Sequence, residues 1–312
     1  MFRLFAIFWL FAVPGAALAQ GWSEGRPMDT ARAALSVVEM QGRIYAIGGA
    51  GRLAPMSVAE RYDPAAGSWR GIPDLPVGLE QFGLANLNGT LYVAGGYAAD
   101  GNGEAGAEVW RFAETDREWQ PAPALPDNRA AFAMVAVGGK LYAIGGSGSQ
   151  SDAMAVFDPE QNEWRLIEGG PKARRAAIAL AIGTKIYVIA GGSASAPSGQ
   201  LDIYDTESDT WTKGAALSIA RSGHAAAVFT GKIHVMGGRG GGRGQTLQDH
   251  WIYDPARDSW SQGKNLSTPR TGAGAAAVGP SLYLIGGGSG GGFYASFTSM
   301  NSVEVLRILP EF

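Results

Sequence analysis

The sequence predicts an all-β fold in which six similar units form one ring. Two observations lead there: a short apolar run that ends in paired glycines occurs six times, and no run shows a sustained helical period. A single glycine-rich turn is what a nucleotide site needs, so six copies indicate an array of structural units. The copies are RIYAIGG at 43, TLYVAGG at 90, KLYAIGG at 140, KIYVIAGG at 185, KIHVMGG at 232 and SLYLIGG at 281.

Six tryptophans set the register of these units. Each is followed 23 residues later by a ring residue, and six such coincidences among only nine tryptophans cannot be chance. The units therefore share one internal layout. The pairs are Trp22 and Tyr45, Trp69 and Tyr92, Trp119 and Tyr142, Trp164 and Tyr187, Trp211 and His234, and Trp260 and Tyr283.

Each unit contains four short β-rich runs separated by Gly, Pro, Asp and Asn turn signals. In the third unit these runs are 131–137, 140–146, 153–159 and 163–169. Four strands per unit, repeated six times, is the sequence signature of a β-propeller with six blades.

The last unit indicates how the ring closes. Its first three strands are expected near 271–278, 282–287 and 302–308, and the chain then ends before any tryptophan. The N-terminal strand containing Trp22 supplies the missing fourth strand, which removes the open sheet edges. We therefore expect residues 20–312 to form a single six-bladed domain.

The repeated motif resembles the kelch repeat. Paired glycines close the second strand, Tyr-Asp-Pro lies on the third at 62–64 and 253–255, and tryptophan lies on the fourth. The resemblance covers nearly the whole of 20–312 and implies a six-bladed kelch-type β-propeller. In that fold the glycines permit a positive φ and a close approach of chains, and the rings fill the space between blades.

The first 19 residues are interpreted as a secretory signal peptide. Arg3 precedes an apolar run over 4–13, Pro14-Gly15 interrupts it, and 17–19 reads Ala-Leu-Ala, a cleavage signal. The alternative, an uncleaved membrane anchor, needs an apolar span of about 20 residues. We expect a mature chain from Gln20 that is periplasmic or secreted, monomeric and not inserted in a membrane.

Composition excludes several kinds of ligand and cofactor. The 24 basic and 28 acidic residues left after removal of Arg3 give a net charge of −4, which argues against nucleic acid as a partner. With no cysteine, disulfides and a copper cofactor built on a Cys–Tyr link are excluded. The only histidines are His224, His234 and His250, so no metal centre is expected. GGGSGG at 286 matches a dinucleotide-binding pattern, but no helical pattern follows it, and no cofactor is expected.

One face of the propeller is expected to bind a ligand. The connection between the second and third strands lies on this face and spans 11 to 19 residues, whereas the other connections are nearly uniform. The face should carry a ring of arginines ten residues after the tryptophans, while the second unit offers Glu80 and Gln81 instead. The candidate binding residues are Arg32, Gln81, Arg129, Arg174, Arg221, Arg239, Arg243, Arg270, Tyr97 and Tyr294.

Two roles are open for the ring of arginines. The guanidinium groups either face an open mouth and attract an anionic ligand, or they bond to backbone carbonyls and carboxylates and brace the loops.

Two functions remain open as well. The first is an exported, non-catalytic binding protein that captures a protein, peptide or glycan. The alternative follows from a resemblance to N-acetylneuraminate epimerase-like single-domain propellers and implies a mutarotase or epimerase for an acidic sugar such as a sialic acid. In that case two or three arginines hold a carboxylate, while Glu80, with His224, transfers protons between ring oxygen and anomeric hydroxyl.

Overall fold

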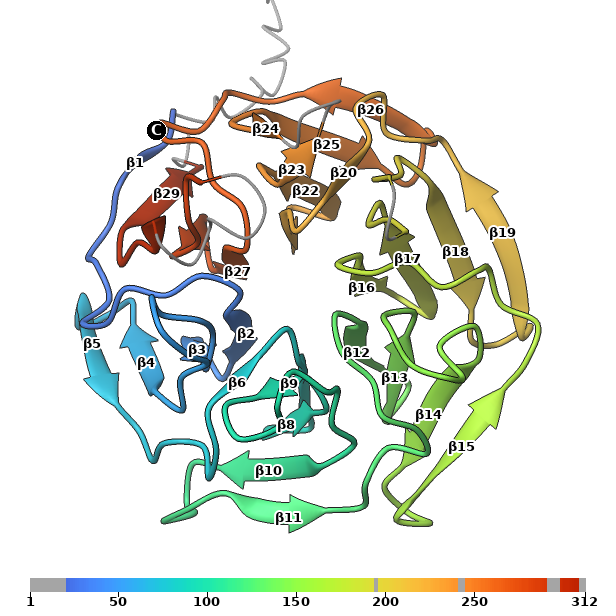
Figure 1. Ribbon diagram of the computed structural model, residues 1–312. Coiled ribbons are helices and arrows are strands. Elements are labelled where there is room, and N and C mark those ends of the chain that lie inside the picture. Colours follow the sequence, from blue (N-terminus) through green and yellow to red (C-terminus); the bar gives the residue numbers. More distant parts are fainter. Residues whose placement is uncertain (1–20, 194–195, 241–244, 291–297, 309–312) are drawn as a thin grey trace, which may run out of the picture.

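The computed structural model describes residues 21–193, 196–240, 245–290 and 298–308. Within these ranges the chain forms six four-stranded antiparallel sheets arranged as a ring (Figure 1). The prediction of a six-bladed, all-β propeller is therefore confirmed. The expected signal peptide and two candidate binding residues, Arg243 and Tyr294, lie outside the described residues.

Each blade takes its strands from consecutive stretches of the chain, except the last. Blade 1 contains β2 (Ser36–Met40), β3 (Arg43–Ile47), β4 (Ala59–Asp63) and β5 (Ser68–Gly71), and blade 2 contains β7 (Gly83–Leu87), β8 (Thr90–Ala94), β10 (Val109–Ala113) and β11 (Gln120–Ala122). Blade 3 contains β12 (Ala133–Val137), β13 (Lys140–Ile144), β14 (Met154–Asp158) and β15 (Glu163–Ile167), and blade 4 contains β16 (Ile178–Ile182), β17 (Lys185–Ile189), β18 (Leu201–Asp205) and β19 (Thr210–Gly214). Blade 5 contains β21 (Ala225–Phe229), β22 (Lys232–Met236), β25 (His250–Asp254) and β26 (Ser259–Gln262), and blade 6 contains β27 (Gly274–Val278), β28 (Ser281–Ile285), β29 (Val303–Arg307) and β1 (Ser23–Glu24).

The core of the molecule is divided among the seams between blades. In β13, Leu141 and Ala143 pack in a cluster with residues of blade 2, whereas Tyr142 and Ile144 pack with residues of blade 4. Successive side chains of a strand point to opposite faces of its sheet, so each inner strand contributes to two seams. This explains why the second strands are apolar at almost every position.

The repeated tryptophans join neighbouring blades by hydrogen bonds. At five seams the indole N–H donates to a carbonyl that follows the outer strand of the preceding blade, over 2.7 to 2.9 Å. The bonds run from Trp22 to Lys264, Trp69 to Arg26, Trp119 to Pro73, Trp164 to Pro123 and Trp260 to Ala215.

The N-terminal segment completes blade 6, as predicted. Strand β1 pairs antiparallel with β29, with Ser23 opposite Val305, and Figure 1 shows the two strands side by side. The predicted closing strand included Trp22, whereas the observed strand begins one residue later. The Trp22 ring instead packs edge-on against His250 of blade 5, with ring centroids 5.5 Å apart.

The second glycine of each pair lies where two blades come close together. Gly146 has a φ of +90°, and a Cβ at this position would lie 2.5 Å from the carbonyl oxygen of Ala130. Its N–H donates to the Arg174 carbonyl of the next blade over 2.9 Å. The equivalent bonds run from Gly49 to Leu79, Gly96 to Arg129, Gly191 to Arg221, Gly238 to Arg270 and Gly287 to Arg32. In the fourth unit Ala190 and Gly191 take the places of the two glycines.

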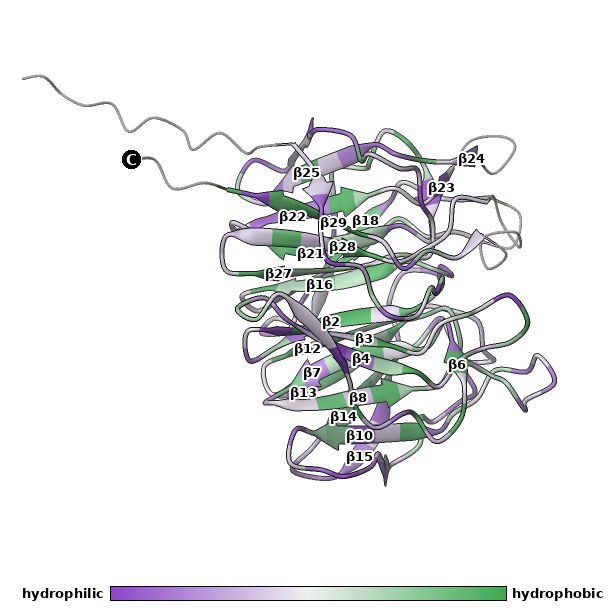
Figure 2. Cartoon of the chain, turned by 90° about the vertical axis from the view of Figure 1, so that its left-hand side faces the viewer, coloured by the Kyte–Doolittle hydropathy of each residue, from purple (hydrophilic) through white to green (hydrophobic). Residues whose placement is uncertain are grey.

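Two small sheets lie outside the blades and were not predicted. Strand β6 (Leu79–Glu80) pairs with β9 (Tyr97–Ala98), and β23 (Arg239–Gly240) pairs with both β20 (Arg221–Ser222) and β24 (Gln245–Thr246). Figure 2 shows β6, β23 and β24 on the same face of the propeller. They position the residues that surround the mouth of the central channel.

Candidate binding site at the channel mouth

A closed belt of backbone hydrogen bonds surrounds the central channel. One residue of each blade, twelve positions after the tryptophan, has a φ between 50° and 63°. Its N–H donates to the carbonyl of the same position in the preceding blade, over 2.7 to 3.4 Å. The belt uses both backbone polar groups of all six residues. Its bonds run from Ala34 to Gly272, Gln81 to Ala34, Ala131 to Gln81, Ala176 to Ala131, Gly223 to Ala176 and Gly272 to Gly223.

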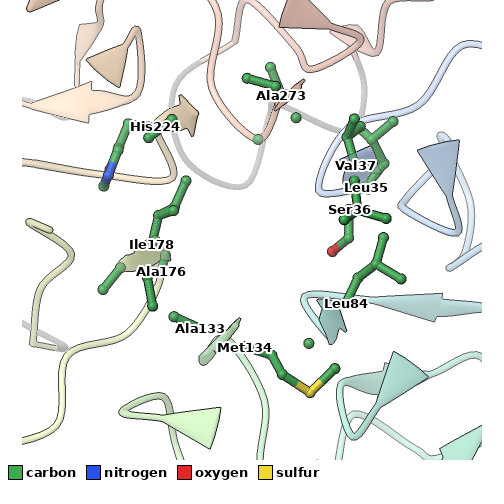
Figure 3. Close-up of a pocket in the computed structure, with 18 of the residues that line it drawn as sticks. Leu35, Ser36, Val37, Leu84, Ala133, Met134, Ala176, Ile178, His224 and Ala273 are labelled. Carbon is green, nitrogen blue, oxygen red and sulfur yellow. The ribbon is translucent and has the colours of Figure 1, made fainter. Parts of the chain in front are cut away.

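The channel itself is a cavity of about 760 Å³ lined by the first strand of every blade. Its wall is largely apolar, with Val37, Leu84, Met134 and Ile178 among the lining residues. Of the ten side chains labelled in Figure 3, only those of Ser36 and His224 contain a nitrogen or oxygen atom. A ligand inside the channel would therefore meet mainly carbon.

The five repeated arginines do not line this channel. Their exposed fractions range from 0% to 7%, and each forms an ion pair with a carboxylate over 2.5 to 2.9 Å. The pairs are Arg32 with Glu60, Arg129 with Asp127, Arg174 with Asp202, Arg221 with Asp249 and Arg270 with Glu304.

Other guanidinium donors of these arginines bind backbone carbonyls, whereas Nε of Arg32 and Nε of Arg270 have no hydrogen-bond partner among the described residues. Arg32, for example, donates to Gly48 and Val58 of its own blade, which holds the connection between the second and third strands. Of the two roles left open by the sequence, this geometry matches the bracing role. The expected ring of ligand-binding arginines must be corrected accordingly, because buried guanidinium groups with carboxylate partners are not available to an anion.

Blade 2 shows how the pair can be replaced. Leu79 stands at the arginine position, and Trp110 stands where blade 1 has Glu60. Blade 2 therefore lacks both the arginine and the carboxylate of the pair. In blades 1, 4 and 5 the acid follows the arginine by 28 residues. This repeated spacing is the signal in the sequence that would have revealed the bracing role.

Two charged side chains lie at the mouth: Glu80 on β6 and Arg239 on β23 line the cavity. Neither has a hydrogen-bond or ion-pair partner among the described residues. Arg239 is exposed and Glu80 is half-buried, and burial raises the pKa of the Glu80 carboxyl. Glu39, the third charged residue in the lining, accepts a bond from Gly42 at the hairpin on the opposite face. Gln81, a candidate binding residue, is exposed and also lines the cavity.

Tyr97 lies at the rim and takes part in a bridge between blades. Its hydroxyl accepts a hydrogen bond of 2.6 Å from Arg175 of blade 4 and lies 3.3 Å from the Ser147 hydroxyl of blade 3. Arg175 is exposed, and its neighbour Ala176 lines the cavity. Arg175 was not among the predicted site residues, although the pair Arg174-Arg175 places a second cation one residue nearer the channel.

His224 was predicted to assist proton transfer, but its surroundings are apolar. It is 2% exposed, and neither ring nitrogen has a hydrogen-bond partner among the described residues. Other blades place Leu35, Phe82 or Phe132 at this position. Burial lowers the pKa of His224 to about 3, which leaves the ring neutral. It also belongs to blade 5, across the ring from Glu80 in blade 2.

The other two histidines form a buried pair in blade 5. Nδ1 of His234 lies 2.9 Å from Nε2 of His250, and the His234 ring also packs against Phe229. Among the described residues, no three side chains of the metal-binding types come together. Nor does any helix in this part of the chain have the length and apolarity to cross a membrane.

The arrangement defines a six-bladed propeller whose channel has a polar mouth, and comparisons with known proteins place it in a family. A model of the KLHDC2/KLHL20/DRC7 Kelch-repeats domain matches residues 81–287, and a Kelch motif model matches 31–76. The chain belongs to the kelch-repeat family.

Individual relatives share only part of their length with this chain. Kelch-like protein 23 of Mus musculus is 30% identical over 141 residues, which are 45% of this chain and 25% of that protein. Kelch-like protein 15 of Danio rerio is 27% identical over 216 residues, 62% of this chain and 35% of that protein. The chain thus spans about a quarter to a third of these two relatives.

The solved structure of YjhT superimposes on this chain with a TM-score of 0.76 at 18% identity, and the match covers 91% of this chain and 99% of that one. This likeness concerns the fold.

Proposed function

We propose that this protein is an exported binding protein that holds its ligand at the mouth of the central channel. The observation that carries this proposal is the contrast between two sets of charges. The five repeated arginines are buried in ion pairs, whereas Glu80 and Arg239 line a large cavity and have no hydrogen-bond or ion-pair partner within the described ranges. Unpaired charged groups beside an apolar cavity are typical of a binding site.

Export is proposed from the leader over residues 1–19. The ligand classes expected from the sequence, namely a protein, a peptide or an anionic sugar, can each present a charged group to the mouth. N-terminal sequencing of the protein from its native host tests the leader, since a chain that still begins at Met1 would contradict export with cleavage.

Binding at the mouth is tested by ligand-dependent thermal stability. A ligand that binds only the native state raises the melting temperature. We expect hits from a panel of acidic sugars, neutral sugars and amino acids to stabilise the wild type and Arg52→Gln, but to stabilise Arg239→Gln much less. Arg52 is an exposed cation outside the cavity lining and so is the matched control. Equal stabilisation of all three proteins would contradict binding at the mouth.

A second candidate function, exchange of the anomers of an acidic sugar, is favoured by one observation. Glu80 has a carboxyl with a raised pKa at the rim of the cavity, as a group that donates and accepts protons needs. The same panel separates the two functions. If an acidic sugar binds and its anomers exchange faster with the wild type than with Glu80→Gln, the protein is catalytic; binding without exchange by either supports the binding protein.

A further inference from the structure

Two asparagines of this chain are followed by glycine, and both lie in the same kind of turn. The pairs are Asn88-Gly89 and Asn102-Gly103. The first pair has φ values of 52° and 83° and the second has 51° and 81°, as in a type I′ turn. Both asparagines are exposed. Because sequence and backbone conformation are shared, a difference in chemistry between the two sites must come from their surroundings.

An asparagine that precedes glycine can lose its side-chain amide without an enzyme. The backbone nitrogen of the glycine attacks Cγ of the asparagine and passes its proton, through water, to the side-chain nitrogen, which leaves as ammonia. Water then opens the five-membered imide at one of its two carbonyls, and the product is aspartate or isoaspartate. Glycine favours this ring closure because it has no Cβ to obstruct the attacking nitrogen.

At Asn88 the attacking nitrogen is engaged. The Gly89 N–H donates to Oδ1 of Asn86 over 3.0 Å. The turn joins β7 to β8, and these two strands pair along their whole length. Ring closure requires the nitrogen to lose its hydrogen bond and the asparagine to leave its left-handed conformation. The hydrogen bond and the paired strands oppose these changes.

At Asn102 the attacking nitrogen is free. Gly103 is exposed, and its N–H has no hydrogen-bond acceptor among the described residues. A Cβ at Gly103 would meet no atom within 4 Å beyond its chain neighbours. The turn is closed by a bond of 2.9 Å from the Glu104 N–H to the Gly101 carbonyl, in an exposed loop rather than between paired strands. Such a turn opens at a low free-energy cost.

We propose that Asn102 is a site of spontaneous deamidation, which the folded protein converts to aspartate or isoaspartate while it preserves Asn88. The neighbouring pair Asp100-Gly101 forms the same imide only by loss of water, and its Gly101 N–H is engaged by the Ala98 carbonyl over 3.2 Å. The conversion adds a negative charge to the loop that follows β9, on the face that carries the channel mouth. It requires no ligand and is independent of the proposed function.

Peptide mapping by liquid chromatography and mass spectrometry tests this inference on the purified protein, incubated folded at mildly alkaline pH. We expect Asn102 to deamidate at least about tenfold faster than Asn88, because one retained hydrogen bond lowers a rate by up to about a factor of ten and the paired strands add to it. In urea, where the chain is unfolded, the two asparagines should react at similar rates.

Two variants identify the cause of the difference. Asn86→Ala removes the acceptor of the Gly89 N–H, so deamidation of Asn88 should become several-fold faster while Asn102 reacts as before. Asn102→Gln should remove the modification from this loop, because glutamine would have to close a larger ring. Circular dichroism and melting temperature confirm that each variant is folded.

Two results would overturn the inference. One is equal deamidation of Asn88 and Asn102 in the folded wild type. The other is an Asn102 that stays intact in the folded protein although it reacts in urea. If Asn86→Ala is folded and leaves the rate at Asn88 unchanged, the free nitrogen of Gly103 is not the cause, and the argument from hydrogen bonding is overturned as well.

Discussion

Buried arginines at equivalent positions pair with carboxylates in five of the six blades. Arg32 and Glu60 are 0% and 3% exposed, with 2.5 Å between their charged atoms. Burial lowers the pKa of Arg32 and raises the pKa of Glu60, and the attraction between the two opposes both shifts. Such a pair holds the geometry of the connection but contributes little net stability, since each charge loses its water.

Removing one member of this pair should destabilise the protein strongly. Arg32→Met leaves the buried Glu60 carboxylate without its opposite charge, although the Asp29 N–H still donates to it, and we expect the variant to lower the free energy of unfolding by about 3–5 kcal/mol. The double variant Arg32→Met/Glu60→Leu should recover most of the loss, because blade 2 already has an apolar version of this site. Urea unfolding measures both, with Arg52→Met as the exposed control. A loss below about 1 kcal/mol for Arg32→Met would contradict the bracing role.

The histidine pair of blade 5 should make stability depend on pH. Burial lowers the pKa of His234 to about 3 and that of His250 to about 4, whereas an unfolded histidine has a pKa of about 6.5. Below about pH 6.5 the unfolded chain therefore binds more protons than the folded one. The contribution of the two histidines to the free energy of unfolding is fully present above this pH. It decreases as the pH falls toward the pKa values of the folded protein.

The variant His234→Gln isolates this effect, because glutamine can bond to His250 but does not titrate. Each histidine contributes at most about 1.4 kcal/mol per pH unit to the pH dependence of the free energy of unfolding. Between about pH 6 and 4, the variant should lack the contribution that His234 makes to this dependence. Chemical denaturation over this range measures the slope. If wild type and variant have the same slope, His234 is not neutral in the folded protein.

At the scale of the element, strand β1 has an effect out of proportion to its two residues. It covers the edge of β29, and the residues beside it make two further contacts between blades. The Trp22 indole donates to Lys264 of blade 5, and the Arg26 carbonyl accepts a bond from Trp69 of blade 1. This segment therefore joins three blades.

Deleting residues 21–26 should weaken the whole ring. The deletion exposes the edge of β29, removes both tryptophan contacts and opens the ring, so we expect one transition at a lower temperature. Hydrogen exchange followed by mass spectrometry should show faster exchange in all six blades. The variant Glu24→Ala, which changes only an exposed side chain, should match the wild type. Faster exchange confined to blade 6 would show that the blades unfold independently.

For the molecule as a whole, the propeller separates the groups that brace it from the groups available to a ligand. Bracing arginines and tryptophan bonds lie in the blades and seams, while the free charges Glu80 and Arg239 lie on the small sheets at the mouth. Both kinds of residue come from connections on the same face. For this reason the sequence predicts both kinds as one site, in which Glu80, Gln81 and Arg239 stand together with five buried arginines.

The sequence by itself determined the number of blades, their strands and the closure by the N-terminal segment. These features depend on local periodicity and on the register of Trp22 and the five tryptophans that follow it, which can be counted along one chain. Only the tertiary structure decided which charges are free. The direction of Arg32 depends on Glu60, which lies 28 residues away, and Glu80 and Arg239 line the same mouth only because the closed ring brings blades 2 and 5 to one channel.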